Sequence, residues 1–295
     1  MRNDTTCPAS GPCHGTETPA AAGGIRTAVF GDPGVTTSLR MCARELAEFR
    51  GLITDHWLGR IASQYPSEVV DQFRQVGLPR YHELAHLVDH KTLWPKTERL
   101  LPQSAVERIR SMPFMQALAG DFGEFGISNE EEIHSEEIYW RIVRPGAPSD
   151  IGPIHADAWF WELGHGRIPP DTVRVKVWIP FFSEPGMNGL LVLPGSQREY
   201  YPYHGEERDG FVKPQVDFDQ RALPMQLLNI EPGTLVVFHD RLLHGGALNS
   251  GRTTRVSAEF TMFVSRAGLL ARGCTAAQIA GSAALHPGSS RQRVA

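Results

Sequence analysis

Two pairs of a histidine and an acid, each with one residue between them, are the first features of this sequence that could bind a metal ion. They are His134 with Glu136 and His155 with Asp157. Twelve histidines in 295 residues make such pairs common by chance, so their surroundings must decide. His155 and Asp157 lie in the apolar run 153–159, which predicts a strand, and residues two apart on a strand face the same side. The other pair lies in a glutamate-rich stretch, and we expect it to face solvent.

A metal site of this kind needs a further ligand. Two imidazoles and one carboxylate bind a non-haem Fe(II) ion on one side and leave its other positions open for a cosubstrate and O2. His155 and Asp157 supply two of these groups, so a distant histidine must complete the set. His239 and His244 are the candidates, because one ends and the other follows the apolar run 234–239.

Further motifs occur in a fixed order between about residues 137 and 264. The segment 188–196 reads NGLLVLPGS, a later Pro-Gly turn and apolar strand lead to His244, and Arg255 follows eleven positions after this histidine. In this order the motifs resemble the phytanoyl-CoA dioxygenase family of Fe(II)/2-oxoglutarate-dependent oxygenases. The resemblance implies a double-stranded β-helix (jelly roll), an Fe(II) ion bound by His155, Asp157 and His244, and 2-oxoglutarate and O2 as cosubstrates.

The resemblance also implies the reaction. Members of the family oxidise 2-oxoglutarate to succinate and CO2 while they oxidise a C–H bond of a substrate. Related halogenases have a small residue at the position of Asp157 and so leave room for halide, which makes this chain a hydroxylase rather than a halogenase. Desaturation and cyclisation stay open. We expect the substrate to be a small metabolite of specialised metabolism.

Three residues are expected to bind 2-oxoglutarate. The guanidinium of Arg255 offers a forked, permanently charged partner for the far carboxylate, and Ser257 shares its face of a predicted strand. Trp178 falls where the family often has a tryptophan that packs against the cosubstrate. Arg252 is the alternative to Arg255. Gly246 departs from the family pattern, because some members have a hydroxyl residue there.

Arg174, Lys176 and Trp178 alternate on the predicted strand 173–179 and therefore share one face. If Trp178 points inward, both cations point toward the metal, whereas long cationic side chains otherwise extend into solvent. An inward lysine requires an anion, which would be the substrate, the cosubstrate or an acid of the protein. We therefore expect an acidic substrate bound by Lys176 and Arg174, with Trp159 lining the pocket or filling the core.

Two other functions remain as alternatives. Residues 82–86 read HELAH and match the HExxH motif of zinc peptidases, which predicts a zinc metallopeptidase through His82, Glu83 and His86. Pro79 precedes this motif closely, and the sequence identifies no third ligand after it. The other alternative is a jelly-roll protein that binds a ligand without catalysis.

The elements that must position these residues follow from the apolar pattern. Apolar residues three and four apart from Ser38 to Trp57 predict an amphipathic helix, residues 67–76 predict a second, and a capping box at residues 104–107 predicts the start of a third. After Phe125 short apolar runs alternate with Pro-Gly turns, which predicts a mainly β jelly roll below a helical N-terminal layer. The predicted strands are residues 137–143, 153–159, 173–179, 190–193, 226–230, 234–239 and 254–264.

One catalytic domain is expected over residues 31–270, mainly helical over 31–125 and a jelly-roll core over 126–270. Residues 1–30 and 271–295 are rich in small and polar residues, so we predict a disordered N-terminal tail and a flexible C-terminal tail.

Composition excludes other classes of protein. The formal charge of −4 and the pI near 6.3 provide no basic field for nucleic acid or an anionic membrane. The sequence also has no apolar run of about 18 residues and no pattern of a secretory signal. We expect a cytoplasmic enzyme with a small-molecule substrate and without nucleic-acid or membrane partners. The sequence leaves its oligomeric state open.

Overall fold

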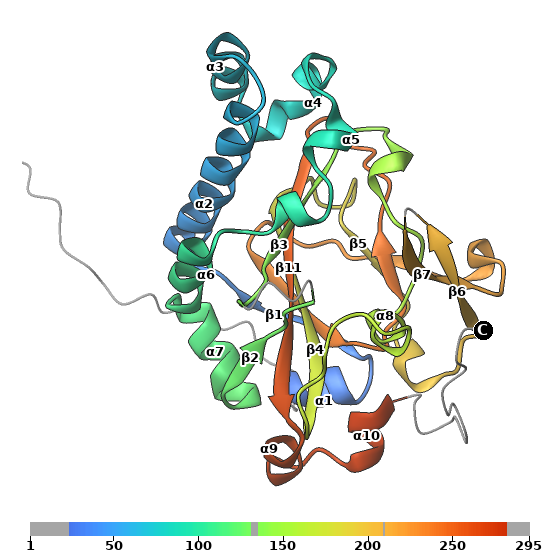
Figure 1. The fold of residues 1–295 in the computed structure, drawn as a ribbon. Coiled ribbons are helices and arrows are strands. Elements are labelled where there is room, and N and C mark those ends of the chain that lie inside the picture. The colour runs from blue at the N-terminus through green and yellow to red at the C-terminus, as the bar shows by residue number, and fades with distance from the viewer. Residues whose placement is uncertain (1–23, 131–134, 209, 282–295) are drawn as a thin grey trace, which may run out of the picture.

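The computed structural model describes residues 24–130, 135–208 and 210–281. Its main element is an antiparallel six-stranded sheet with the order β1-β9-β4-β11-β2, in which β3 also pairs with β11 (Figure 1). These strands are β1 (Val35–Arg40), β2 (Phe125–Ile127), β3 (Tyr139–Val143), β4 (Thr172–Phe182), β9 (Thr234–His239) and β11 (Arg255–Ser265).

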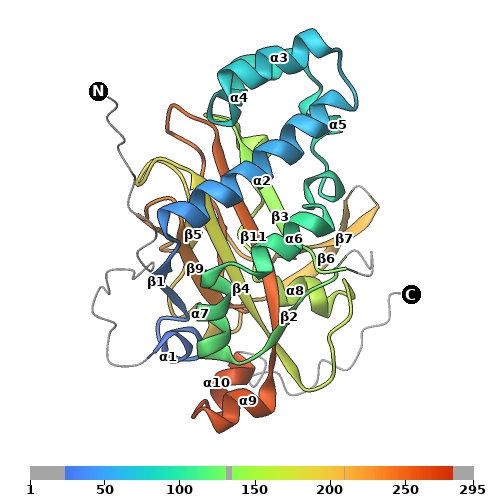
Figure 2. The same cartoon turned by 90° about the vertical axis from the view of Figure 1, so that its left-hand side faces the viewer.

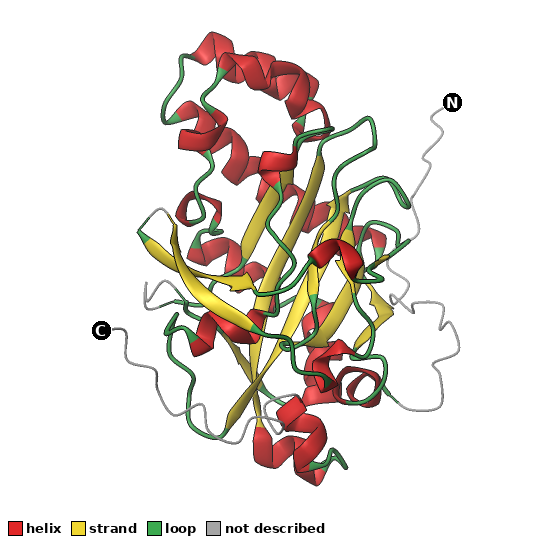
Figure 3. Ribbon diagram, turned by 90° about the vertical axis from the view of Figure 1, so that its right-hand side faces the viewer, coloured by secondary structure: helices red, strands yellow, loops and turns green. Residues whose placement is uncertain are grey.

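A smaller sheet and a hairpin complete the β structure. The second sheet has the order β10-β5-β8, and the hairpin consists of β6 and β7 (Figure 3). Their bounds are β5 (Leu190–Val192), β6 (Tyr203–Arg208), β7 (Phe211–Val216), β8 (Gln226–Leu227) and β10 (His244–Gly246). Side chains of β4 and β9 pack against Leu190 and Val192 of β5, so the two sheets face each other. The predicted jelly roll is confirmed.

Helices form a layer on one side of the large sheet. Figure 2 shows α2, α6 and α7 lying across β9, β4 and β11. The α-helices are α1 (Ile25–Phe30), α2 (Ala43–Ala62), α3 (Ser67–Val76), α4 (Tyr81–Leu84), α5 (His90–Leu93), α6 (Gln103–Arg110), α7 (Pro113–Phe122), α8 (Asp157–Glu162), α9 (Arg266–Ala271) and α10 (Ala276–Ala280). No helix among the described residues is long and apolar enough to cross a membrane.

The period of two along β4 and β11 gives the large sheet two different faces. The outer face packs on the helical layer and is apolar: it carries Val173, Val175, Val177, Ile179, Phe181, Val256, Ala258, Phe260, Met262 and Val264. The inner face carries Arg174, Lys176 and Trp178 of β4 and Arg255, Ser257, Glu259 and Thr261 of β11, and it turns toward the smaller sheet. Each large side chain buried on the outer face contributes about 1.5–3 kcal/mol to stability.

Several predicted boundaries are wrong. The first long helix begins at Ala43 rather than near Ser38, because Leu39 belongs to β1 and pairs with Leu235 of β9. The backbone N–H of Cys42 donates to the Glu45 carboxylate, which caps the start of the helix. The third helix begins after Pro102 with no side-chain cap, so the predicted capping box does not form.

The predicted strand over residues 153–159 is also wrong. His155 makes only an isolated bridge to His244, and helix α8 begins at Asp157. An aspartate is favourable in the first turn of a helix, where its charge meets the positive end of the helix dipole.

Both predicted tails contain helix where the structure describes them. Ile25, Val29 and Phe30 of α1 and Ile279 of α10 are buried in the main core. Burial of these apolar side chains offsets the conformational entropy that is lost when the two short segments become ordered, although their remaining residues are small or polar. Residues 1–23 and 282–295 lie outside the described residues.

Candidate metal centre

Three potential metal ligands gather at the mouth of the jelly roll. His155, Asp157 and His244 each offer one ligand atom, and these atoms all lie within 4.8 Å of one another. Of the residues that the structure describes, no other three histidine, cysteine or acidic side chains meet in this way. The two predicted histidines and the aspartate are therefore brought together, although the predicted strand does not form.

Backbone pairing explains how they meet. The N–H of His155 donates to the carbonyl of His244 and the N–H of His244 donates to the carbonyl of His155, both at 2.9 Å. This bridge places the two imidazole rings 4.5 Å apart between centroids. Helix α8 then turns Asp157 toward both rings, with its carboxylate 3.7 Å from Nε2 of His155 and 3.6 Å from Nε2 of His244.

Both imidazoles are oriented by hydrogen bonds. Nδ1 of His155 donates to the carbonyl of Pro153, and Nδ1 of His244 donates to the carbonyl of Leu242, each at 2.9 Å. A proton held on Nδ1 leaves the lone pair of Nε2 free to bind a metal. Both Nε2 atoms face Asp157.

The charges at the site suit a divalent cation. Burial lowers the pKa of His244 to about 4, so its ring is neutral at pH 7. Burial alone would raise the pKa of Asp157, but Lys176, His244 and His155 hold it well below its usual value. One oxygen of this carboxylate, Oδ2, is buried and accepts no hydrogen bond. A neutral His244 imidazole beside an ionised carboxylate with a free oxygen fits an Fe(II) site with open positions.

Lys176 lies on the inner face of β4, next to Asp157 of this group. Its Nζ is 3.7 Å from Asp157 and 3.8 Å from Glu259 of β11. Glu259 also accepts a 2.6 Å hydrogen bond from Nε of Arg141 in β3. The anions that lie beside this inward lysine are acids of the protein. This is one of the three possibilities considered for it, the others being the substrate and the cosubstrate. The expected contact between Lys176 and an acidic substrate therefore has no support in the structure.

Arg174 and Trp159 also have partners within the protein. The guanidinium of Arg174 forms an ion pair with Asp240, which lies beside His239. Trp159 stacks on Tyr203 of the hairpin, with centroids 4.5 Å apart. His239 is buried and contacts Asp240, so it is not part of the group around Asp157.

Arg255 lies at the start of β11 on the inner face and is only 2% exposed, whereas Arg252 is exposed. Its Nη1 donates to the carbonyl of Gly189, and its Nε is buried without a hydrogen-bond partner. Burial lowers the pKa of Arg255 to about 10, assisted by the nearby charge of Arg141. No carboxylate of the described residues forms an ion pair with this guanidinium.

Polar groups beside Arg255 suit the carboxylate of a bound dicarboxylate. The hydroxyl of Ser257 is also buried without a partner, and Trp178 lies with its ring centroid 5.9 Å from the guanidinium carbon. A Cβ on Gly246 would lie 3.3 Å from Nη2 of Arg255, so this glycine keeps one side of the guanidinium open. The three residues predicted to bind 2-oxoglutarate thus lie together.

The HExxH match does not form a zinc site. Its helix ends at Leu84, and His86 lies in the following 3-10 turn. Glu83 is paired with Arg80, and Nδ1 of His82 lies 2.9 Å from the hydroxyl of Thr254. Of the pair His134 and Glu136, which was expected to face solvent, His134 lies outside the described residues.

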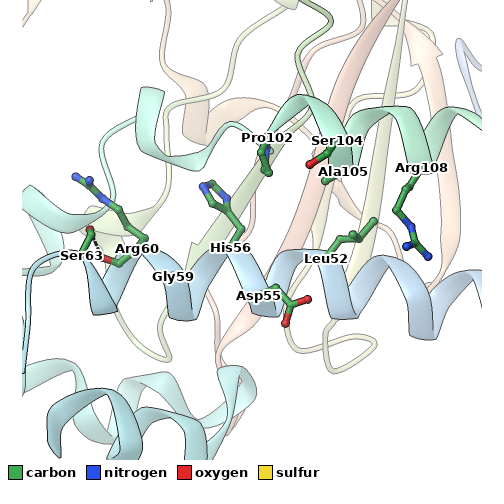
Figure 4. Close-up of a pocket in the computed structure, with 10 residues that line it drawn as sticks. All are labelled: Leu52, Asp55, His56, Gly59, Arg60, Ser63, Pro102, Ser104, Ala105 and Arg108. Carbon is green, nitrogen blue, oxygen red and sulfur yellow. Dashed lines mark hydrogen bonds between the residues drawn. The ribbon is translucent and has the colours of Figure 1, made fainter. Parts of the chain in front are cut away.

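A groove and a cavity of the surface lie at different places relative to the metal centre. A groove of about 730 Å³ lies between α2 and α6, and its one histidine, His56, accepts a hydrogen bond from Trp140 (Figure 4). A cavity of about 1240 Å³ lies elsewhere and includes Phe160 in its wall. The ring of Phe160 contacts that of His155 edge-on, with centroids 5.4 Å apart. The larger cavity therefore adjoins the metal centre, and sequence reasoning missed Phe160.

Comparison with known proteins places this geometry in context. The family model described as phytanoyl-CoA dioxygenase (PhyH) matches residues 42–257. A search of curated protein sequences finds no match.

Solved structures are similar in fold. The apo structure of the non-heme monooxygenase ThoJ has a TM-score of 0.51 and 17% identity, over 82% of this chain and 77% of ThoJ. The epimerase SnoN in complex with Fe3+, alpha ketoglutarate and nogalamycin RO has a TM-score of 0.47 and 14% identity, over 81% of this chain and 82% of SnoN. AviO1 from Streptomyces viridochromogenes Tue57 has a TM-score of 0.45 and 13% identity, over 81% of this chain and 93% of AviO1. At such low identity the similarity to ThoJ shows the fold alone.

Proposed function

This chain belongs to the phytanoyl-CoA dioxygenase family of Fe(II)/2-oxoglutarate-dependent oxygenases, and we propose that it hydroxylates a C–H bond of a small molecule. The observation that carries the proposal is the group of His155, Asp157 and His244 beside a buried guanidinium that has no carboxylate partner. These are the groups that an iron ion and a dicarboxylate cosubstrate require.

Each residue has a role in this proposal. His155, Asp157 and His244 would hold Fe(II), which when bound supplies the redox chemistry by which O2 oxidises 2-oxoglutarate to succinate and CO2 and the substrate to an alcohol. Arg255 binds the far carboxylate of 2-oxoglutarate. Ser257 donates its hydroxyl to the same carboxylate.

The protein around these groups orients and shields them. The carbonyls of Pro153 and Leu242 fix the two ligand imidazoles, and Trp178 closes the cosubstrate pocket against water. Asp157 occupies the ligand position that a halide would need, which supports hydroxylation over halogenation. We place the substrate among the small molecules of specialised metabolism.

Anaerobic addition of Fe(II) and 2-oxoglutarate to the purified protein tests the proposal. The expected result is a visible charge-transfer absorption band, and then formation of succinate when O2 is admitted. Glu83→Gln is the matched control for the zinc peptidase alternative, and it should change neither result. Folded protein that gives neither the band nor succinate would contradict the proposed function.

A further inference from the structure

The cavity next to the metal centre has walls from five parts of the chain. They are the segment 85–99 of the helical layer, Glu130 in the loop after β2, β3 with the loop after it, the region of α8, and β7 of the hairpin (Figures 1 and 3). Arg141 and Phe160 connect it to the centre, because Arg141 binds Glu259 and Phe160 contacts His155. Its volume of about 1240 Å³ accommodates a small-molecule substrate.

Cations outnumber acids in the cavity wall. The wall carries the cations Lys91, Lys96, Arg99, Arg141, Arg144 and Lys213 and the acids Asp89, Glu130 and Asp150. Each acid already has a partner. Asp150 accepts two hydrogen bonds from the guanidinium of Arg144 and one from its backbone N–H, Glu130 pairs with Lys96, and Asp89 accepts the N–H groups that open α5.

Arg99 is the half-buried cation whose charge no acid of the wall neutralises. Its Nε and Nη1 donate to the carbonyls of Trp94 and Trp140, at 3.1 and 3.2 Å. Among the described residues no carboxylate forms an ion pair with it. These two backbone contacts fix the guanidinium plane, and they leave Nη2 without a hydrogen bond to the described residues.

Charge is also unbalanced where the cavity meets the metal centre. Ion pairs link Asp157, Lys176, Glu259 and Arg141 in sequence, and Arg141 lies close enough to Arg99 and Arg255 to lower the pKa of both. These groups are four cations and two carboxylates. Glu130 and Asp150 also lie close enough to act on them, but each forms an ion pair with another cation, Lys96 and Arg144 respectively. One Fe(II) ion and one 2-oxoglutarate dianion would cancel each other, so an excess of two positive charges persists in the loaded site.

We propose that Arg99 binds an anionic group of the substrate, a carboxylate or a phosphate. The substrate is then a small acid whose apolar part lies near Phe160, between this anchor and the metal ligands. Lys176 does not serve this purpose, because Asp157 and Glu259 already flank its ammonium group. This inference rests on the proposed function, since the cavity is a substrate site only if the adjoining centre is catalytic.

Binding of three small probes to the anaerobic protein loaded with Fe(II) and saturating 2-oxoglutarate tests the proposal. The probes are 3-phenylpropionate, phenyl phosphate and the neutral 3-phenylpropan-1-ol, and calorimetric titration gives their dissociation constants. Wild-type protein should bind at least one of the acids about tenfold or more tightly than the alcohol, the usual effect of a charged hydrogen bond. Arg99→Gln should abolish this preference, and Arg99→Lys should restore part of it.

Arg50 supplies the matched control. It is also half-buried, donates to one backbone carbonyl, that of Phe181, and has no carboxylate partner among the described residues, but it does not belong to the cavity wall. Arg50→Gln should keep the full preference for acids. Equal affinity of wild-type protein for acids and alcohol, or an unchanged preference in Arg99→Gln, would overturn the proposal.

A labelling experiment covers the case in which Arg99→Gln does not fold. Phenylglyoxal modifies accessible arginines, and mass spectrometry identifies the labelled residues. In wild-type protein 3-phenylpropionate or phenyl phosphate, whichever binds more tightly, should protect Arg99 and leave labelling of Arg50 unchanged, whereas lack of protection at Arg99 by both acids overturns the proposal. The charge-transfer band with Fe(II) and 2-oxoglutarate is recorded in the same samples, so failure of the proposed function is seen separately.

Discussion

The outer and inner faces of the large sheet are built from the same strands. They differ in the polarity of their side chains and in what those side chains contact. Along β4 the outer residues Val177 and Ile179 pack against the helical layer, while the inner residues Lys176 and Trp178 face the smaller sheet. The outer face is held by close packing of apolar groups. The inner face keeps charged groups away from water, which is stable only where opposite charges meet.

Unsatisfied polar atoms show the same difference. Four buried atoms without a hydrogen-bond partner lie on the inner face of β4 and β11, and none lies on the outer face of these strands: they are Nε of Arg174, Nε of Arg255, Oγ of Ser257 and Oγ1 of Thr261. A protein that leaves buried groups unpaired loses stability unless a ligand completes them. Of these four atoms, Nε of Arg255 and Oγ of Ser257 belong to the residues proposed to bind the cosubstrate.

The largest expected effect comes from the three residues that meet at the end of the inner face. His155→Ala, Asp157→Ala and His244→Ala should each reduce Fe(II) binding and succinate formation below about one hundredth of wild type, with the fold retained. Iron titration and circular dichroism measure the two properties. His239→Ala should still bind Fe(II), because His239 contacts Asp240 instead. If His239→Ala lost iron and His244→Ala kept it, the distal ligand would be wrongly assigned.

Arg255→Ala should have the next largest effect. Removing the partner of a buried carboxylate costs about 3–5 kcal/mol, so the KM for 2-oxoglutarate should rise by about two to four orders of magnitude. The exposed Arg252 is the matched control, and Arg252→Ala should leave this KM unchanged. Steady-state succinate formation at varied 2-oxoglutarate measures both, and an unchanged KM in Arg255→Ala would refute its role.

Lys176→Met should destabilise the metal-free protein at neutral pH. Burial would raise the pKa of Glu259, but Arg141 and Lys176 hold it well below its usual value. A lowered pKa in the folded state contributes stability at neutral pH that is lost as the pH falls. Loss of Lys176 leaves two buried carboxylates close together, so the variant should lose about 3–5 kcal/mol at pH 7.

The pH dependence distinguishes this pairing from a role in substrate binding. The difference in free energy of unfolding between wild type and Lys176→Met should shrink as the pH falls below about 4, toward the lowered folded-state pKa values of Glu259 and Asp157. Denaturant unfolding at several pH values measures it. A side chain that extends into solvent predicts no difference at any pH.

The sequence predicted the composition of the centre better than its local structure. The order of motifs predicted that His155, Asp157 and His244 meet, and they do. It also predicted Arg255 nearby, and this guanidinium lies next to Gly246, two residues after His244. The predicted reason, a shared strand face for His155 and Asp157, was wrong, because a backbone bridge to His244 and the start of α8 place them instead. Motif order thus carried more information than local apolar periodicity.

Two other features show what a sequence can and cannot reveal. Glu259 was missed although it lies four residues after Arg255 on the predicted strand, so the alternation that selected Ser257 already placed Glu259 on the same face. The cavity at Arg99 could not be predicted, because it depends on how the segment 85–99 packs beside β3. Such packing is a property of the assembled layers and has no local pattern.

The smallest expected effects give the most direct comparison of the two faces. Ile179→Val on the outer face should cost about 0.5–1.5 kcal/mol in the free energy of unfolding and leave the KM for 2-oxoglutarate unchanged. Ser257→Ala on the inner face removes a hydroxyl that has no partner within the protein, so stability should change little. Loss of one hydrogen bond to the cosubstrate should instead raise this KM about threefold to tenfold. Equal effects of both substitutions on stability and on KM would contradict the division of the sheet into a structural outer face and a ligand-binding inner face.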